Sequence, residues 1–256
     1  MKTAVLLSGG IDSTTALAQA VDTYGAENVI ALSVLYGQKH KKELSCAEKI
    51  ANYYGVQRIS FDVTPLFSYS HNSLMEHSDK AVPQTSYAEQ IEETKGQSPV
   101  STYVPFRNGI FLSAAAGVAL SLDCERVVYG AHADDAAGAA YPDCSPAFFD
   151  AMKTAVYEGT GGGITLEAPF IHMNKTGIVA EGLRLHVPYE LTWSCYEGGD
   201  KPCGLCGTCR DREAAFSANG TIDPLLKGKQ DGKTDTLRQS ERDLCHRIQP
   251  ENLGSL

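Results

Sequence analysis

The chain has 256 residues, of which 43% are hydrophobic and 21% are charged, the balance of a soluble globular protein with one substantial core. A net charge of -9 disfavours a protein that binds a nucleic-acid backbone over a wide surface, and favours a small-molecule substrate. The apolar stretch at the N-terminus is short and leads into glycine and aspartate. We therefore predict a strand there, no signal peptide, no membrane segment and a cytoplasmic protein.

A strand, a glycine turn and a helix open the chain. Residues 3–7 are apolar and uncharged, as in a strand buried on both faces of a parallel sheet. After Gly9 and Gly10, apolar residues recur at helical spacing and predict a helix that begins near Asp12 or Ser13. The unpaired N–H groups at the start of such a helix suit a phosphate. A tight connection capped by Asp12 or Ser13, without a ligand, is the alternative.

Three features favour a phosphate site at this turn. Ser8 and Ser13 place hydroxyl groups on both sides of the glycines, and the strand begins almost at the chain start. Asp12 would repel a phosphate unless a divalent cation bridged the two, so we expect Mg²⁺. No lysine follows at the P-loop spacing, and the glycines do not fit the G-x-G-x-x-G dinucleotide pattern.

Strands and helices alternate along the rest of the chain. Further strands are predicted at residues 28–37, 56–63, 126–131 and 164–170, and helices at 39–54, 108–122 and 175–185. This order predicts an α/β fold with a doubly wound parallel sheet, in which ligands bind beyond the carboxyl ends of the strands. The polar segment at about 64–104 interrupts the alternation. We interpret it as a lid or substrate loop, with a disordered excursion as the alternative.

Four cysteines lie within fifteen residues in the sequence CYEGGDKPCGLCGTC: Cys195, Cys203, Cys206 and Cys209. Their spacing predicts a closed tetrahedral Zn²⁺ site, with a structural role because no ligand position stays open. Disulfides and an iron–sulfur cluster are the alternatives. Cys46 and Cys124 are scattered and are interpreted as buried inert thiols.

The loop SGGIDS at residues 8–13 resembles the signature of the ATP pyrophosphatase (PP-loop) superfamily. Five further motifs follow in family order: YGQKHKKE (36–43), YVPFRN (103–108), YPDC (141–144), MNKTGI (173–178) and TWSCY (192–196). Together these motifs resemble the 7-cyano-7-deazaguanine synthase (QueC) family, over most of the chain from residue 3 to about residue 226.

The resemblance implies a PP-loop domain of the adenine nucleotide alpha hydrolase-like type at residues 1–190, a zinc-binding segment at 191–226 and a polar tail at 227–256. It also implies a homodimeric ligase that forms carbon–nitrogen bonds in queuosine biosynthesis. The substrates would be 7-carboxy-7-deazaguanine, ammonia and ATP, and the product 7-cyano-7-deazaguanine. The route would pass through an adenylated acid and an amide, with release of AMP and pyrophosphate.

Two alternatives stay open for the acceptor. A QueC-like paralogue of a defence or DNA-modification pathway would use another acceptor or stop at the amide. A tRNA thiolation enzyme would share the ATP loop, but the chain shows no basic RNA-binding region, and no direct nucleic-acid binding is expected.

The resemblance and the residue types together assign roles in ATP binding and catalysis. The residues expected to bind ATP are Ser8, Gly9, Gly10, Ile11, Asp12, Ser13, Thr14 and Tyr36. Asp12 would hold Mg²⁺, and Lys175 would neutralise charge on the phosphates, unless it is a solvated surface lysine. His132 would deprotonate ammonium, with a helix-capping histidine as the alternative.

Three residues are candidates for binding the deazaguanine substrate. Arg107 would pair with the substrate carboxylate or a phosphate, with a helix-start ion pair as the alternative. Asp143 would accept hydrogen bonds from the guanine-like edge, and Tyr141 would stack on the base. Without the family context, the sequence Tyr-Pro-Asp is equally typical of a plain turn.

Overall fold

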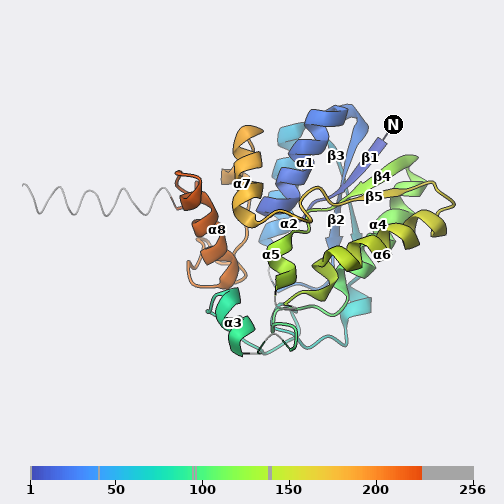
Figure 1. Cartoon of the computed structure of the whole chain (residues 1–256). Helices are drawn as coiled ribbons and strands as arrows, with labels where there is room; N and C mark the ends of the chain where they lie inside the picture. The colour runs from blue at the N-terminus through green and yellow to red at the C-terminus, as the bar shows by residue number, and fades with distance from the viewer. Residues whose placement is uncertain (1, 40, 94, 96, 138–139, 227–256) are drawn as a thin grey trace, which may run out of the picture.

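The computed structural model describes residues 2–39, 41–93, 95, 97–137 and 140–226, so the polar tail at 227–256 lies outside the described residues. Five parallel strands form one sheet in the order β3-β2-β1-β4-β5 (Figure 1). Their bounds are β1 (Lys2–Leu6), β2 (Val29–Leu35), β3 (Gln57–Asp62), β4 (Cys124–Val128) and β5 (Thr165–Glu167). The predicted doubly wound parallel sheet is confirmed. Because the chain winds outward from β1 in both directions, the switch point lies between β1 and β4.

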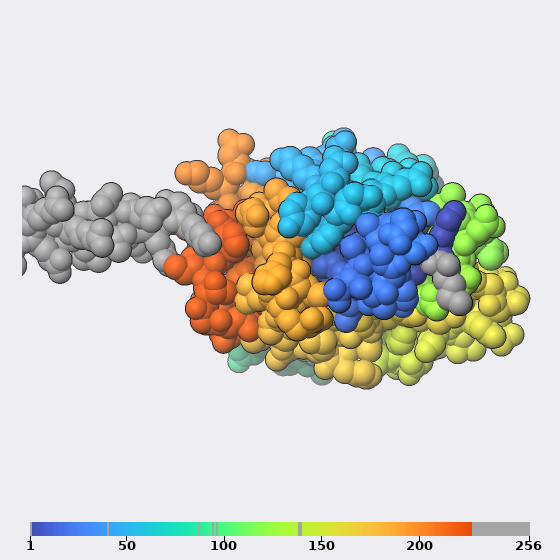
Figure 2. Space-filling view, turned by 90° about the horizontal axis from the view of Figure 1, so that it is seen from above, coloured from blue at the N-terminus to red at the C-terminus, as the bar shows by residue number. Residues whose placement is uncertain are grey.

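Helices cover both faces of the sheet. One face carries α1 (Ile11–Tyr24), α2 (Lys42–Tyr54) and α7 (Lys175–Arg184), and the other carries α4 (Arg107–Ser121) and α6 (Pro146–Gly159). Side chains of β1 alternate between the two cores, since Val5 packs under α1 and Ala4 packs under α4. Figure 2 shows α1 (blue) beside α7 (orange), and α8 (Gly207–Ala218) packs on α7. None of the described helices is long and apolar enough to cross a membrane.

Several predicted boundaries were wrong by a few residues. The first helix begins at Ile11, because Gly10 has extended backbone angles and serves as its N-cap without a side-chain cap. Neither Asp12 nor Ser13 caps the helix, as both lie inside it. The fifth strand is only Thr165–Glu167, since it pairs with β4 alone, at the edge of the sheet.

The segment at 64–104 is ordered over its described residues. A short bridge joins Gln38 to Met75, and Met75 is fully buried. A 3-10 helix (Thr64–Phe67) and α3 (Tyr87–Glu93) are its regular elements. Phe67 packs edge-on against Tyr36, at the carboxyl end of β2. The segment therefore lies over the carboxyl edge of the sheet, where the cavity described next is found.

Candidate active site

A cavity of about 250 Å³ opens at the carboxyl edge of the sheet, beside the switch point. The turn after β1 forms one wall, and the starts of α2, α4 and α7 form others. The cysteine-rich segment adds a further wall. Of the residues singled out in the sequence, those lining the cavity are Ser8, Gly10, Ile11, Asp12, Ser13, Tyr36, Arg107 and Lys175. Those outside the lining are Gly9, Thr14, His132, Tyr141 and Asp143.

The glycine turn is held by its own hydroxyl groups. The Oγ atoms of Ser8 and Ser13 lie 3.0 Å apart, and the Ser8 N–H donates to Ser13 Oγ at 3.2 Å. Thr14 Oγ1 donates to the Gly10 carbonyl at 2.7 Å, which fixes the first turn of α1 from behind. No side chain caps α1, and its first residues line the cavity, an arrangement that suits an anion.

Gly9 is required by both its backbone and its neighbours. Its φ is +96°, and a Cβ there would lie 2.3 Å from the backbone oxygen of Glu43. We expect Gly9→Ala to lower the free energy of unfolding by about 2–5 kcal/mol, because strain and a backbone clash add. The measurement is a urea unfolding midpoint. The control is Gly117→Ala on the exposed side of α4, where a Cβ meets nothing within 4 Å and a small gain is expected. Equal midpoints for the two variants would contradict this account.

Asp12 and Lys175 form an ion pair at the cavity wall. Lys175 Nζ donates to both carboxylate oxygens of Asp12, at 2.7 and 2.6 Å. Burial alone would raise the pKa of Asp12, but the charge of Lys175, the nearby His132 and the hydrogen bonds to the carboxylate together offset it and hold the pKa below its ordinary value. Asp12 is therefore ionised at neutral pH. Two contacts position Lys175 at the start of α7. The Asn174 side chain caps the helix, and Asp134 accepts the backbone N–H of Lys175 at 2.7 Å.

His132 lies just behind this pair. Its side chain is 2% exposed, and its Nε2 is 3.4 Å from an Asp135 oxygen and 3.8 Å from Asp12 Oδ2. Neither ring nitrogen has a hydrogen-bond partner among the described residues. His132 is thus close to the Asp12 carboxylate but separated from the cavity surface.

Two acidic residues of the cavity were missed in the sequence. Asp211 of α8 faces Lys175 and the acidic pair at 134–135, and its burial, with the charges of that pair, raises its pKa to about 6. Glu43 of α2 lines the cavity near Arg107. Asp211 has no local signal, since it lies in a charged helical stretch that is typical of a solvated face. Glu43 ends the motif at 36–43, but it follows several charged residues and nothing in the sequence singles it out. Only the tertiary fold brings them to the cavity.

Arg107 and Tyr36 line the cavity side by side. The Arg107 guanidinium lies 5.5 Å from the centre of the Tyr36 ring, and its Nη1 is 3.4 Å from the Tyr36 hydroxyl. Arg107 makes no ion pair of 4.0 Å or less with any described carboxylate, so the helix-start ion pair is not formed. A cation that lines a cavity without a bound carboxylate is suited to an anionic ligand.

Asp143 and Tyr141 lie behind the cavity wall. Asp143 is 3% exposed, and its Oδ2 accepts the Asn108 N–H at 2.8 Å, at the start of α4. Burial raises the pKa of this carboxyl despite that hydrogen bond and the nearby Arg107. The Tyr141 hydroxyl bonds to Thr102 in the segment at 64–104. In this structure Asp143 positions the start of α4, and therefore Arg107.

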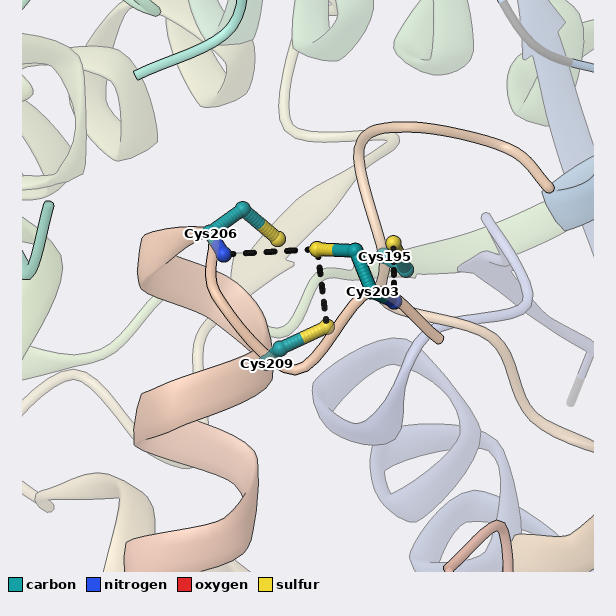
Figure 3. A group of neighbouring side chains, drawn as sticks. All are labelled: Cys195, Cys203, Cys206 and Cys209. Carbon is teal, nitrogen blue, oxygen red and sulfur yellow. Dashed lines mark hydrogen bonds between the residues drawn. The ribbon is translucent and has the colours of Figure 1, made fainter. Parts of the chain in front are cut away.

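The four clustered cysteines converge on one point (Figure 3). All four sulfur atoms lie within 4.8 Å of one another, and the Sγ atoms of Cys203 and Cys209 are 3.9 Å apart. Zn–S bonds of about 2.3 Å in a tetrahedron place sulfurs about 3.8 Å apart, so the cluster has the dimensions of a single-ion site. Backbone N–H groups of Leu205 and Cys206 donate to Cys203 Sγ, both at 3.4 Å, which stabilises a thiolate. The cluster can hold a metal.

Arg212 connects the cysteine cluster to the main domain. It is 3% exposed and pairs with buried Asp223 through two hydrogen bonds of 2.8 and 2.9 Å. It also donates to Thr192 and to the carbonyl of Tyr189. Since Cys206 and Cys209 start the same helix, the cluster fixes the end of α8 that faces the cavity.

The parallel sheet, with an open helix start and a glycine turn at its switch point, defines a doubly wound α/β fold whose site suits an anionic ligand. The family model for the queuosine biosynthesis protein QueC matches residues 2–220. The chain belongs to this QueC family of queuosine biosynthesis enzymes.

Two similar proteins that carry the same name, 7-cyano-7-deazaguanine synthase, support membership of this family. The chain is 44% identical to the 7-cyano-7-deazaguanine synthase of Archaeoglobus fulgidus, over 90% of this chain and 92% of the relative. It is 43% identical to the synthase of the same name from Caldicellulosiruptor bescii, over 88% of this chain and 96% of the relative. A solved U34-tRNA thiolase NcsA from Methanococcus maripaludis, with its 4Fe-4S cluster, is 17% identical with a TM-score of 0.46, covering 100% of this chain and 77% of that one.

Proposed function

We propose that this chain converts 7-carboxy-7-deazaguanine and ammonia into 7-cyano-7-deazaguanine, using ATP and releasing AMP and pyrophosphate. The observation that carries the proposal is one cavity lined both by an anion-binding turn and by an arginine that makes no ion pair of 4.0 Å or less with any described carboxylate. ATP phosphates suit the turn, and the substrate carboxylate suits Arg107. In this arrangement the carboxylate and the α-phosphate meet in the middle of the cavity.

Adenylation supplies the leaving group that the chemistry needs. Ammonia cannot displace oxygen from a free carboxylate, whereas AMP leaves readily once the carboxylate is bonded to it. The amide is then activated in the same way, and its loss of AMP gives the nitrile. In this proposal Lys175 neutralises phosphate charge, and Asp12 binds a Mg²⁺ ion together with oxygens of ATP. Asp135 and Asp211, which also line the cavity and lie near Lys175, would offer further oxygen ligands to the ion.

The experiment incubates the protein with the acid, ATP, Mg²⁺ and ammonium, and follows products by mass spectrometry. We expect the acid to become the amide and then the nitrile, with two AMP for each nitrile. If the product stops at the amide, the chain is a paralogue of the biosynthetic enzyme. If no AMP forms with folded, metal-loaded protein, the ligase proposal is wrong.

The metal of the cysteine cluster is proposed to be one Zn²⁺ ion with a structural role. The support is the spacing of the sulfurs, because a four-iron cluster needs its cysteine sulfurs farther apart than a single ion does. Metal analysis of the purified protein tests this. The homodimer and the cytoplasmic location implied by the family resemblance complete the proposal, and light scattering would measure the oligomeric state.

A further inference from the structure

Glu43 lines the cavity and is the last residue of the motif at 36–43, but the sequence assigned it no role and the phosphate site does not use it. It lies in the first turn of α2, and its backbone oxygen packs against Gly9 of the glycine turn. Its side chain lines the same cavity as Arg107 and Tyr36. The packing of α2 on the glycine turn therefore holds the Glu43 carboxylate at the cavity wall, near Arg107.

The surroundings of this carboxylate are sparse. Within the part of the chain that the structure describes, it has no hydrogen-bond donor and no ion-pair partner within 4.0 Å. The titratable groups that face it are Arg107 on α4, Tyr36 after β2 and Cys46 on its own helix. Lys42 is directed elsewhere, since its Nζ bonds to the carbonyls of Gly199 and Asp200. Burial raises the pKa of Glu43 to about 7, although Arg107 acts in the opposite direction.

The proposed reaction needs a group of this kind. At neutral pH the nitrogen donor is almost entirely ammonium, which has no lone pair and cannot attack an acyl adenylate. A carboxylate facing a cavity attracts the ammonium cation, and it can also accept the proton. Arg107 at its side would orient the carbonyl that is to be attacked. The need for such a base rests on the proposed function.

We propose that Glu43 binds the ammonium substrate and is the general base that converts it into ammonia for attack on the adenylated acid. Glu43 takes one proton of ammonium, and the freed lone pair forms the C–N bond. The C–O bond to AMP breaks, and its electron pair leaves on the AMP phosphate. The second surplus proton passes from the nitrogen to water, which gives the amide.

In this proposal Glu43 takes the role of deprotonating ammonium, which the sequence assigned to His132. His132 does not line the cavity, and it lies beside Asp12, just after the glycine turn that is proposed to bind phosphate. Glu43 lines the cavity next to the arginine that is proposed to bind the reacting carboxylate. The nitrogen must approach that carbonyl, so Glu43 is the better placed of the two groups.

The first test needs only the unaltered protein. Amide formation is measured against pH, with ammonium far below saturation so that its attack limits the rate. With Glu43 as base, the rate rises until Glu43 is ionised, near pH 7, and is then flat between about pH 7.5 and 8.5. Without an enzymic base, the rate follows free ammonia and keeps rising about tenfold per pH unit. A continued rise of that kind would overturn the proposal.

The second test uses Glu43→Gln, with Glu48→Gln as the matched control on the exposed side of α2. We expect Glu43→Gln to lower amide formation from ammonium by about 10²–10⁴-fold relative to pyrophosphate release. Hydroxylamine, which is already mostly neutral at pH 7, should still form the hydroxamate at a rate close to that of the control. Parallel loss of amide and hydroxamate would contradict a base role. An unaltered protein that forms no AMP would instead contradict the proposed function itself.

Discussion

Lys175→Met is expected to lower pyrophosphate release from ATP and the acid substrate by about 10²–10³-fold, the effect of removing one preorganised charge from a reacting centre. Lys175 Nζ lies 2.6 Å from Asp12 Oδ2 and borders the open start of α1. Burial alone would lower the pKa of Lys175, but Asp12 and Asp135 more than offset it, so the side chain stays charged. Negative charge develops on the phosphate oxygens as pyrophosphate leaves. In the variant, the ammonium group of Lys175 would no longer be there to neutralise it.

A matched lysine on the other face of the sheet serves as the control for this prediction. Lys153 of α6 is exposed and lies over the Phe149 ring, away from the cavity. Lys153→Met should release pyrophosphate at the rate of the unaltered protein. Lys175→Arg keeps the charge on a bulkier, planar group, and intermediate activity is expected. A Lys175→Met protein with full activity would show that Lys175 serves Asp12 only as a structural partner.

The alternation of strands and helices was predictable because each element carries its own periodic signal. The strand before Ser8 is apolar on both faces, as a central parallel strand requires, and the structure buries Val5 and Ala4 in opposite cores. The glycine turn was equally clear, since two glycines between such a strand and a helix are typical of a tight connection at the carboxyl edge of a sheet. The exact N-cap was missed, because glycine at this position gives no side-chain signal.

The composition of the cavity wall was only partly predictable. Lys175 and Arg107 were found because each lies in a motif at the start of a helix. Glu43 also lies in a motif at the start of a helix, but both it and Asp211 stand among other charged residues, and helical spacing alone does not tell which charged side chain turns inward. Asp143 shows the reverse case, because this carboxylate of a family motif accepts the Asn108 N–H instead of lining the cavity.

The cysteine cluster and the cavity share α8, and this makes the metal site part of the catalytic architecture. Cys206 caps the helix, Cys209 lies in its first turn, and Asp211 and Arg212 follow directly into the cavity wall. On the other side, Arg210 lies 3.6 Å from Glu89 of α3, which ties α8 to the segment over the cavity. A change at the cluster should therefore disturb both the part of the cavity wall on α8 and the contact between α8 and α3.

Cys206→Ala is accordingly expected to lose the metal and most of the activity together. Removal of a direct ligand should weaken metal binding by more than about 100-fold, since loss of outer-shell partners of a ligand already costs about 10–100-fold. Without the ion, three thiolates repel one another, and the start of α8 loses its anchor. Metal content, protease sensitivity of residues 191–226 and pyrophosphate release are the measurements.

Cys124→Ala provides the comparison, because Cys124 is equally buried but lies at the start of β4, away from the cluster and the cavity. It should keep one metal ion per chain and near-normal pyrophosphate release, with only a modest loss of stability. If Cys206→Ala were metal-free yet fully active, α8 would be held by the Arg212–Asp223 pair and its apolar packing alone. A parallel loss of metal and activity would instead show that the cluster keeps α8, and with it Asp211, in position at the cavity.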